Sequence, residues 1–269
     1  MKTLLKRFLC LFLILSMLCT ASFSAFAEDG NQSNSSLLDL LGSLLLNGMQ
    51  KFGSPALSHQ ETVDALRDLG IEISDSTVLE VEKSMDELKQ WYLENGLDYR
   101  EDPSDFQLYL LSAVGMGEYD YETGAWTPSS DDVYYFDAEV FDIMNMYRLF
   151  LQGISSIVPG FEPSDIQEHI EENLPDEGTT TWFQSAEGTT TVSFMLNGKQ
   201  YEHTLDFLGD WFNEDAITWI NQVLKEEGFP GRIHSFYDGL QGLILFYGDD
   251  EYGKKLKKIV PDPFAGLFR

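Results

Sequence analysis

The sequence predicts an α+β fold, in which N-terminal helices are followed by a mostly antiparallel sheet of hairpins with helices packed against it. Residues 58–114 show the helical spacing of apolar side chains at i, i+3 and i+4. The C-terminal half instead contains short β-rich runs joined by the turn dipeptides Asn197-Gly198 and Asp238-Gly239. With 43% hydrophobic and 13% aromatic residues, the chain has enough apolar side chains to build a packed core.

Four regions are predicted to follow one another along the chain. Residues 1–27 form a signal peptide, and residues 28–54 form a flexible leader with a short leucine-rich helix that either binds a partner or docks on its own domain. Residues 55–116 form a helical region, and residues 117–262 form an α+β region. Together, residues 55–262 make either one domain or two.

The N-terminal segment has the three parts of a secretory signal peptide. Three basic residues precede an apolar run from Phe8 to Leu15, and Ala25-Phe26-Ala27 supplies a small-residue cleavage site. The run is shorter than the ~20 apolar residues of a membrane span. We therefore expect cleavage after Ala27, secretion, and no membrane anchor on the mature chain. The alternative is lipidation at Cys19, which the bulky Leu18 before it disfavours.

Charge and cysteine content exclude several classes of function. The chain carries 17 Lys and Arg against 45 Asp and Glu, a net charge of −28. Removing residues 1–27 leaves 14 basic against 45 acidic side chains, a net charge of −31. Such a field repels polyanions, so nucleic acids and anionic membrane surfaces are disfavoured as partners. Cys10 and Cys19 both lie in the predicted signal, so the mature chain is cysteine-free, which favours a bacterial source.

Three helices are predicted in the helical region. They cover Glu61–Leu69, Thr77–Asn95, and a third segment that starts at Ser104 and runs through Val114. A glycine follows each of the first two, which is typical of a helix end. Thr77 and Glu80 have the spacing of a capping box, so we expect the second helix to begin at Thr77.

The first part of the α+β region is predicted to be a hairpin followed by a helix. The strands Glu118–Tyr121 and Val133–Phe136 flank the loop Glu122–Asp132. An unbroken apolar stripe then predicts a helix from Ile143 to Ile157, ended by a Pro-Gly pair. The pattern of residues 161–172 fits either a helix or a strand.

The last part is predicted to contain two further hairpins. A β-rich run at Thr179–Gln184 comes before the first of them. The Asn197-Gly198 turn then ends the strand Thr189–Leu196, and this turn places Phe194 opposite Tyr201 and Val192 opposite His203. The remaining predicted elements are a helix capped by Asn213, the strands Arg232–Tyr237 and Leu243–Tyr247, and a last helix at Asp249–Ile259. The strand Leu243–Tyr247 is apolar on both faces, which predicts that it is a central strand.

The chain contains no signature of a known catalytic family. Its four histidines lack the H-E-x-x-H spacing of zinc proteases, and it has no nucleophile elbow, phosphate-binding loop or dinucleotide-binding turn. We therefore predict no cofactor and no metal site. We expect His203 to be half-buried and bonded to a backbone carbonyl, the alternative being a general base partnered by Asp210.

Carboxylates gather in and after the first predicted hairpin, at Asp120, Glu122, Asp137 and Glu139. Together with Trp126, these residues are the predicted binding site. The run that begins at Asp120 resembles a calcium loop, but an alanine replaces the glycine that an EF-hand requires. We therefore expect only a generic, salt-screened attraction for divalent cations. For Asp137 and Glu139 the alternative role is capping of the following helix.

These observations favour a non-enzymatic binding or interaction protein whose partner is a protein or a glycan. The alternative is a carbohydrate-active enzyme or sugar-binding module that uses paired carboxylates and exposed aromatic side chains. We expect Trp126 and Trp182 to be exposed near loops and Trp211, just before a helix, to lie in the core. A cleft with two convergent carboxylates would favour the sugar hypothesis, whereas a shallow surface with an apolar patch would favour the first.

Overall fold

The computed structural model describes residues 57–99, 105–120, 125–140, 144–173, 187–238 and 241–260. Over these ranges it contains six helices and eight strands, the strands pairing antiparallel in three sheets, which confirms the predicted α+β class. The predicted signal peptide, the leader and the run Thr179–Gln184 lie outside the described residues. The division of the chain at residue 116 stays a prediction.

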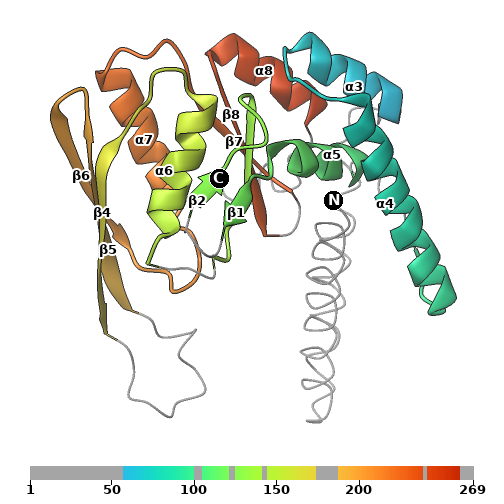
Figure 1. The fold of residues 1–269 in the computed structure, drawn as a ribbon, viewed down its shortest axis with the longest axis horizontal. Helices are drawn as coiled ribbons and strands as arrows, with labels where there is room; N and C mark the ends of the chain where they lie inside the picture. The colour runs from blue at the N-terminus through green and yellow to red at the C-terminus, as the bar shows by residue number, and fades with distance from the viewer. Residues whose placement is uncertain are drawn as a thin grey trace, which may run out of the picture.

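A three-stranded sheet lies at the centre of the molecule (Figure 1). Its order is β3 (Val133–Asp137), β8 (Gly242–Gly248) and β7 (Arg232–Tyr237), so β8 is the central strand, as its apolar pattern predicts. Residues 243–246 of β8 are fully buried and alternate between two separate hydrophobic clusters. The sheet is therefore covered on both faces.

Helices cover each face of this central sheet, and a second sheet lies beyond one helical layer (Figure 1). On one side lie α3 (His59–Asp68), α4 (Asp75–Glu94), α5 (Asp105–Gly115) and α8 (Asp250–Ile259). On the other side lie α6 (Met146–Ile157) and α7 (Asp215–Glu226), followed by the sheet of β4 (Ser164–Asn173), β5 (Glu187–Leu196) and β6 (Lys199–Asp206). The result is a four-layer arrangement of helices, sheet, helices and sheet.

The β5–β6 hairpin has the predicted turn and register. Asn197 and Gly198 have φ values of 52° and 79°, the left-handed conformations that this turn requires. Phe194 pairs with Tyr201 and Val192 with His203. Val192 and Phe194 are buried against α6 and α7, so the turn dipeptide and the alternation of apolar residues together fix which face points inward.

The segment whose pattern fitted either a helix or a strand is the edge strand β4. It pairs antiparallel with β5, and a register shift separates Ser164 from Gln167. Asp165 lies at this irregularity with a φ of 50°. Ile166 packs against the core, and acidic side chains follow along the strand, which makes it a poor template for pairing with another chain.

The structure corrects the predicted pairing of the first hairpin. β1 (Glu118–Asp120) pairs with β2 (Ala125–Thr127), a strand inside the predicted loop, and β3 pairs instead with β8. The Trp126 ring lies where a side chain at Gly117 would otherwise stand, so the glycine lets the two short strands close on each other.

Two predicted helix starts are also corrected. The second helix begins at Asp75 and is capped by Ser74, whose hydroxyl accepts a hydrogen bond from the Thr77 amide at 3.0 Å, so the predicted Thr77 capping box is wrong. Helix α7 begins at Asp215, and the Asn213 side chain accepts from the Asp215 amide at 3.0 Å. Capping patterns near a helix start can shift by a residue or two because neighbouring Ser, Thr and Asn residues compete for the same role.

Candidate functional site

Three segments that are distant in sequence meet at the lower end of the central sheet in Figure 1. They are residues 137–140 after β3, the connection 207–214 between β6 and α7, and the β7–β8 turn, of which 238, 241 and 242 are described. Backbone hydrogen bonds join them: Val140 donates to Asp210 at 2.6 Å, Phe212 to Ala138 at 2.7 Å, and Ala138 to Gln241 at 2.8 Å.

The turn Leu208–Trp211 is held rigidly at this end. Gly209 has a φ of 69°, and the Trp211 amide donates to the Leu208 carbonyl at 3.3 Å, which closes the turn. The hydrogen bonds on both sides of Trp211, from Val140 and Phe212, then fix the turn to residues 138–140. An aromatic side chain on a backbone tied at this many points loses little further freedom when it is bound.

Trp211 is exposed, contrary to the expectation that it belongs to the core. Its side chain is 43% exposed and that of Leu208 is 49% exposed, while Phe212 is buried. The Phe212 ring packs against Phe136 and Phe150, with centroids 5.0 and 4.8 Å away. Because consecutive residues of an extended segment point to opposite sides, burial of Phe212 places Trp211 outside.

Carboxylates lie beside this turn on all three segments. Asp137 accepts a hydrogen bond from the Glu139 amide at 2.9 Å, and burial raises the pKa of Asp137 to about 6, with repulsion from Glu139 and Asp238 adding to the effect. Glu139 accepts a hydrogen bond from the side-chain amide of Gln241. Asp238 accepts from the Tyr135 hydroxyl at 3.0 Å and from the Gly242 amide at 2.9 Å.

Glu214, an exposed residue just before α7, adds another carboxylate to this end of the sheet. It accepts a hydrogen bond from the Tyr237 hydroxyl, and burial raises its pKa, with Asp215 as a smaller cause. The donors to Asp137, Glu139 and Glu214 are a backbone amide, a side-chain amide and a phenol. All are neutral, so these bonds orient the carboxylates without neutralising them.

The stretches of chain that build this end contain no Lys or Arg. They are residues 101–147, 200–224 and 233–253, which supply all three segments. Four lysines follow directly on α8, at the opposite end of β8 (Figure 1). The lysines that follow β8 therefore lie away from the end that carries Trp211.

The residues predicted as the binding site divide between two places. Asp137 and Glu139 lie at the end of the sheet just described, whereas Asp120 and Trp126 lie on the β1–β2 hairpin, and Glu122 lies outside the described residues. The Trp126 ring is half-buried and packs edge-on against Tyr134 at 5.2 Å. The groups that act on Asp137 do not include Asp120.

Other residues at this end were missed at the level of sequence. Trp211 was expected in the core, Asp238 was assigned only to a hairpin turn, and Glu214 and Gln241 carried no motif. The available signal was the Gly209-Asp210 pair, a turn dipeptide between a strand and a helix, which predicts that its neighbours reach the surface. Within the described ranges, no group of three or more His, Asp or Glu side chains has an arrangement that could hold a metal ion.

His203 is half-buried, as expected, but its contact is aromatic. Its ring stacks on Trp219 with centroids 5.2 Å apart and planes 21° from parallel. For the part of the chain that is described, no hydrogen bond joins it to a backbone carbonyl. Asp210, its proposed partner as a base, contributes its own backbone carbonyl to the contact with Val140.

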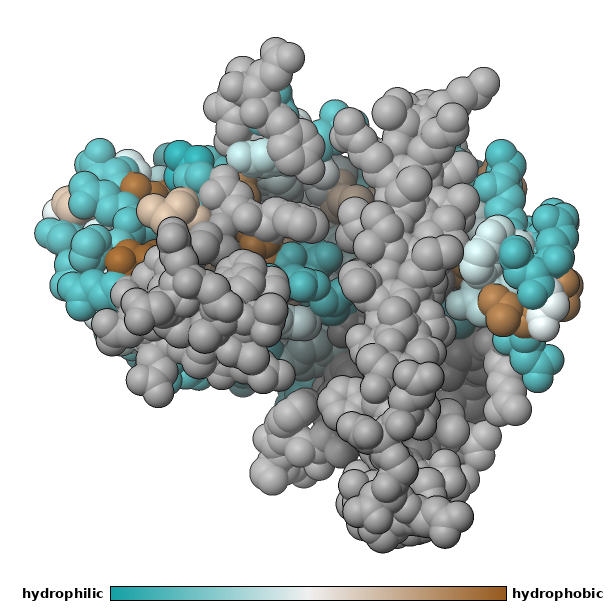
Figure 2. Space-filling model, turned by 90° about the horizontal axis from the view of Figure 1, so that it is seen from below, coloured by the Kyte–Doolittle hydropathy of each residue, from teal (hydrophilic) through white to brown (hydrophobic). Residues whose placement is uncertain are grey.

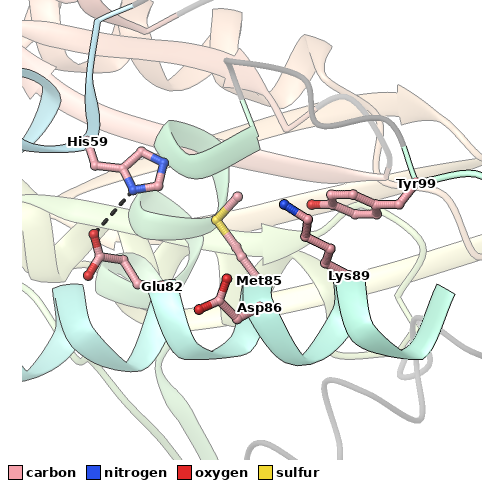
Figure 3. A pocket seen from close by; sticks show the side chains of 6 residues that line it. All are labelled: His59, Glu82, Met85, Asp86, Lys89 and Tyr99. Carbon is pink, nitrogen blue, oxygen red and sulfur yellow. Dashed lines mark hydrogen bonds and ion pairs between the residues drawn. The ribbon is translucent and has the colours of Figure 1, made fainter. Parts of the chain in front are cut away.

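A hollow lies beside α3 and α4 (Figure 3). It has a volume of about 260 Å³ and is lined by His59, Glu82, Met85, Asp86, Lys89 and Tyr99. The His59 ring stacks on Phe106 at 3.8 Å, and its Nδ1 lies 3.2 Å from a Glu82 oxygen. Glu82 is turned toward His59 rather than toward Asp86, so the hollow does not present two convergent carboxylates.

Comparison of the chain with protein-family models, curated proteins and solved structures found no match. None of the helices over the described ranges is both long enough and apolar enough to cross a membrane. The functional argument therefore depends on the geometry and charge of the residues themselves.

Proposed function

We propose that this protein is a non-enzymatic binding protein whose recognition surface is the lower end of the central sheet. We call this surface the Trp211 face and define it by Leu208, Trp211, Asp137 and Glu139. The observation that carries the proposal is the exposure of Trp211 on a turn that backbone hydrogen bonds fix to residues 138–140. Rigid exposed tryptophans are the side chains that contribute most to binding energy at protein interfaces.

The form of the Trp211 face supports binding rather than catalysis. The described residues visible in Figure 2 are mostly hydrophilic, with scattered hydrophobic residues among them. Asp137 accepts a hydrogen bond within its own segment, and Glu139 accepts one from Gln241 of the β7–β8 turn, so both carboxylates have structural roles already. A catalytic pair needs carboxylates that converge on a substrate in a cleft.

Site-specific cross-linking tests the proposal. The chain from Glu28 onward, with photoreactive benzoylphenylalanine in place of Leu208, is incubated with culture of the producing cells and irradiated. Leu93 on α4, which is 61% exposed, gives a matched control position on a different surface. We expect a cross-linked partner at position 208 that is absent at position 93 and is lost when Trp211→Ala is added. Equal cross-linking at both positions would contradict the proposal.

We also propose that the protein is secreted, on the basis of its N-terminal segment. N-terminal sequencing of material from the culture medium should give Glu28 as the first residue. Recovery of the protein in the membrane fraction, with lipid on Cys19, would contradict both the cleavage site and the secreted state.

A sugar-binding module or carbohydrate-active enzyme is the second candidate, favoured by the proximity of Trp211 to Asp137. A carboxyl with a pKa of about 6 is suited to general acid chemistry, and an exposed indole is suited to stacking on a sugar ring. Binding to a panel of polysaccharides, and release of reducing sugar from them, tests this candidate. It requires that Trp211→Ala abolishes binding and that Asp137→Asn abolishes any hydrolysis.

A further inference from the structure

We propose that the Trp211 face binds a cationic protein segment, an extended stretch in which Lys or Arg flanks an apolar side chain. This inference rests on the proposed binding function and names the chemistry of its partner. Three features of the face support such a partner: its negative charge, the hydrogen bonds of its carboxylates, and the exposed indole of Trp211.

The charge of the face is negative and is not compensated within the described structure. No ion pair among the described residues involves Asp137, Glu139, Asp210 or Glu214. Lys and Arg are missing from all three stretches that build this end. A partner that brings cations here replaces repulsion among carboxylates by attraction, so electrostatic complementarity selects a basic segment.

Trp211 supplies the second half of the recognition. The indole face is the best aromatic partner for a Lys ammonium or an Arg guanidinium, and here it stands among carboxylates that attract the same cation. Leu208, three residues away on the same closed turn, offers an apolar contact to the stem of a Lys or Arg, or to an apolar neighbour in the segment. The backbone that carries both side chains is already fixed by hydrogen bonds, which reduces the entropy lost on binding.

The opposite end of the molecule narrows the choice of occupant. Lys254, Lys255, Lys257 and Lys258 of α8 lie beyond the other end of β8, so a second copy could in principle present them to the Trp211 face. Lys254 is paired with Glu251 at 2.6 Å, and all four lysines lie on a regular helix rather than on an extended segment. We therefore assign the face to a different, extended chain and make self-association an outcome of the test.

Three flexible synthetic heptapeptides with blocked ends serve as probes. The basic peptide is Lys-Leu-Arg-Leu-Lys-Leu-Arg. The second peptide has Gln at each of the basic positions, and the third has Glu at the same positions. Their affinity for the chain from Glu28 onward is measured by calorimetry at about 50 and about 300 mM NaCl. We expect the basic peptide alone to bind, and to bind more weakly at the higher salt concentration. Equal binding of the Gln peptide would overturn the inference.

Substitutions separate recognition by this face from the general attraction between an acidic protein and a basic peptide. Trp211→Ala should weaken binding of the basic peptide about thirtyfold, the loss at which a residue counts as a hot spot. Glu139→Gln should weaken it several-fold at low salt, and Leu93→Ala should leave it unchanged. An unchanged affinity for Trp211→Ala, with melting curves that show the variant folded, would overturn the inference.

The result distinguishes this inference from the proposed function. If the cross-link at position 208 depends on Trp211 but the basic peptide binds no better than the Gln peptide, the partner chemistry is wrong and the binding function stands. If both experiments are insensitive to Trp211→Ala, both are wrong. A concentration-dependent dimer that Lys255→Gln with Lys258→Gln abolishes, seen by sedimentation, would assign the face to a second copy and overturn the inference.

Discussion

Replacing Asp137 by Asn is expected to stabilise the protein at neutral pH. Burial raises the pKa of this carboxyl from 3.8 to about 6, with repulsion from Glu139 and Asp238 in the same direction. A pKa that is higher in the folded than in the unfolded state means that the folded state binds the proton more tightly. The stability penalty of the carboxylate is therefore absent below about pH 4, grows between about pH 4 and 6, and is complete above that range.

The size of the penalty follows from the pKa difference. One pKa unit corresponds to about 1.4 kcal/mol, so the full shift would amount to about 3 kcal/mol. Asp137 is only half-buried, and water screens part of the interaction, which reduces the expected value to about 1–2 kcal/mol. Asn retains the carbonyl oxygen that accepts the Glu139 amide, so the substitution removes the charge while it keeps the hydrogen bond.

Urea unfolding at about pH 5 and about pH 7.5 measures this effect. The free energy of unfolding of Asp137→Asn should exceed that of the wild type by about 1–2 kcal/mol at the higher pH and by less at the lower pH. Asp98→Asn, at an exposed position, controls for the general relief of negative charge. A variant that is less stable than the wild type at pH 7.5, or a difference that does not change with pH, would refute the reasoning.

Three further outcomes follow from packing and charge. Gly153→Ala should lower the free energy of unfolding by about 1–3 kcal/mol, because a Cβ at this position would overlap the Tyr134 ring. Thermal melting measures this effect, and an unchanged melting temperature would contradict the packing of the two residues. His203→Gln should lower the free energy of unfolding by about 0.5–1.5 kcal/mol, because the stacking on Trp219 is lost. Peptide binding should stay intact at temperatures where the variant is folded, and a selective loss of binding would make His203 part of the site. Calcium and magnesium should produce the same small, salt-suppressed rise in melting temperature; a large calcium-selective rise that a chelator reverses would reveal a dedicated site.

Features encoded by neighbouring residues were predictable from the sequence. The Asn197-Gly198 turn specifies its own backbone conformation, and with it the pairing of Phe194 and Tyr201 across the hairpin. The central position of β8 followed from apolar residues on both of its faces, because only a strand covered twice tolerates that pattern. In both cases the information lies within about ten residues.

Features that depend on distant pairing were not predictable in the same way. β3 pairs with β8, more than a hundred residues later, while the nearer run Ala125–Thr127 takes the place beside β1. The same distant pairing decides the site. Asp137 and Glu139 were proposed from their spacing, but Trp211 reaches them only because residues 138–140 pair with the turn before α7.

The half-buried carboxylate and the recognition surface are physically coupled, and this coupling makes a last prediction. The ionised form of Asp137 is destabilised by burial and by Glu139 and Asp238, and both of these neighbours are acidic. A Lys or Arg placed there by a partner would favour the ionised form of Asp137 and so lower its pKa. By linkage, the basic peptide must then bind more tightly to the protein with Asp137 ionised, so its affinity should rise several-fold from about pH 5 to about pH 7.5, although Lys and Arg do not titrate in this range. Calorimetry at both pH values, at constant salt, measures this rise. The Asp137→Asn variant should show a smaller one, and an affinity that is independent of pH in the wild type would place the cation away from Asp137.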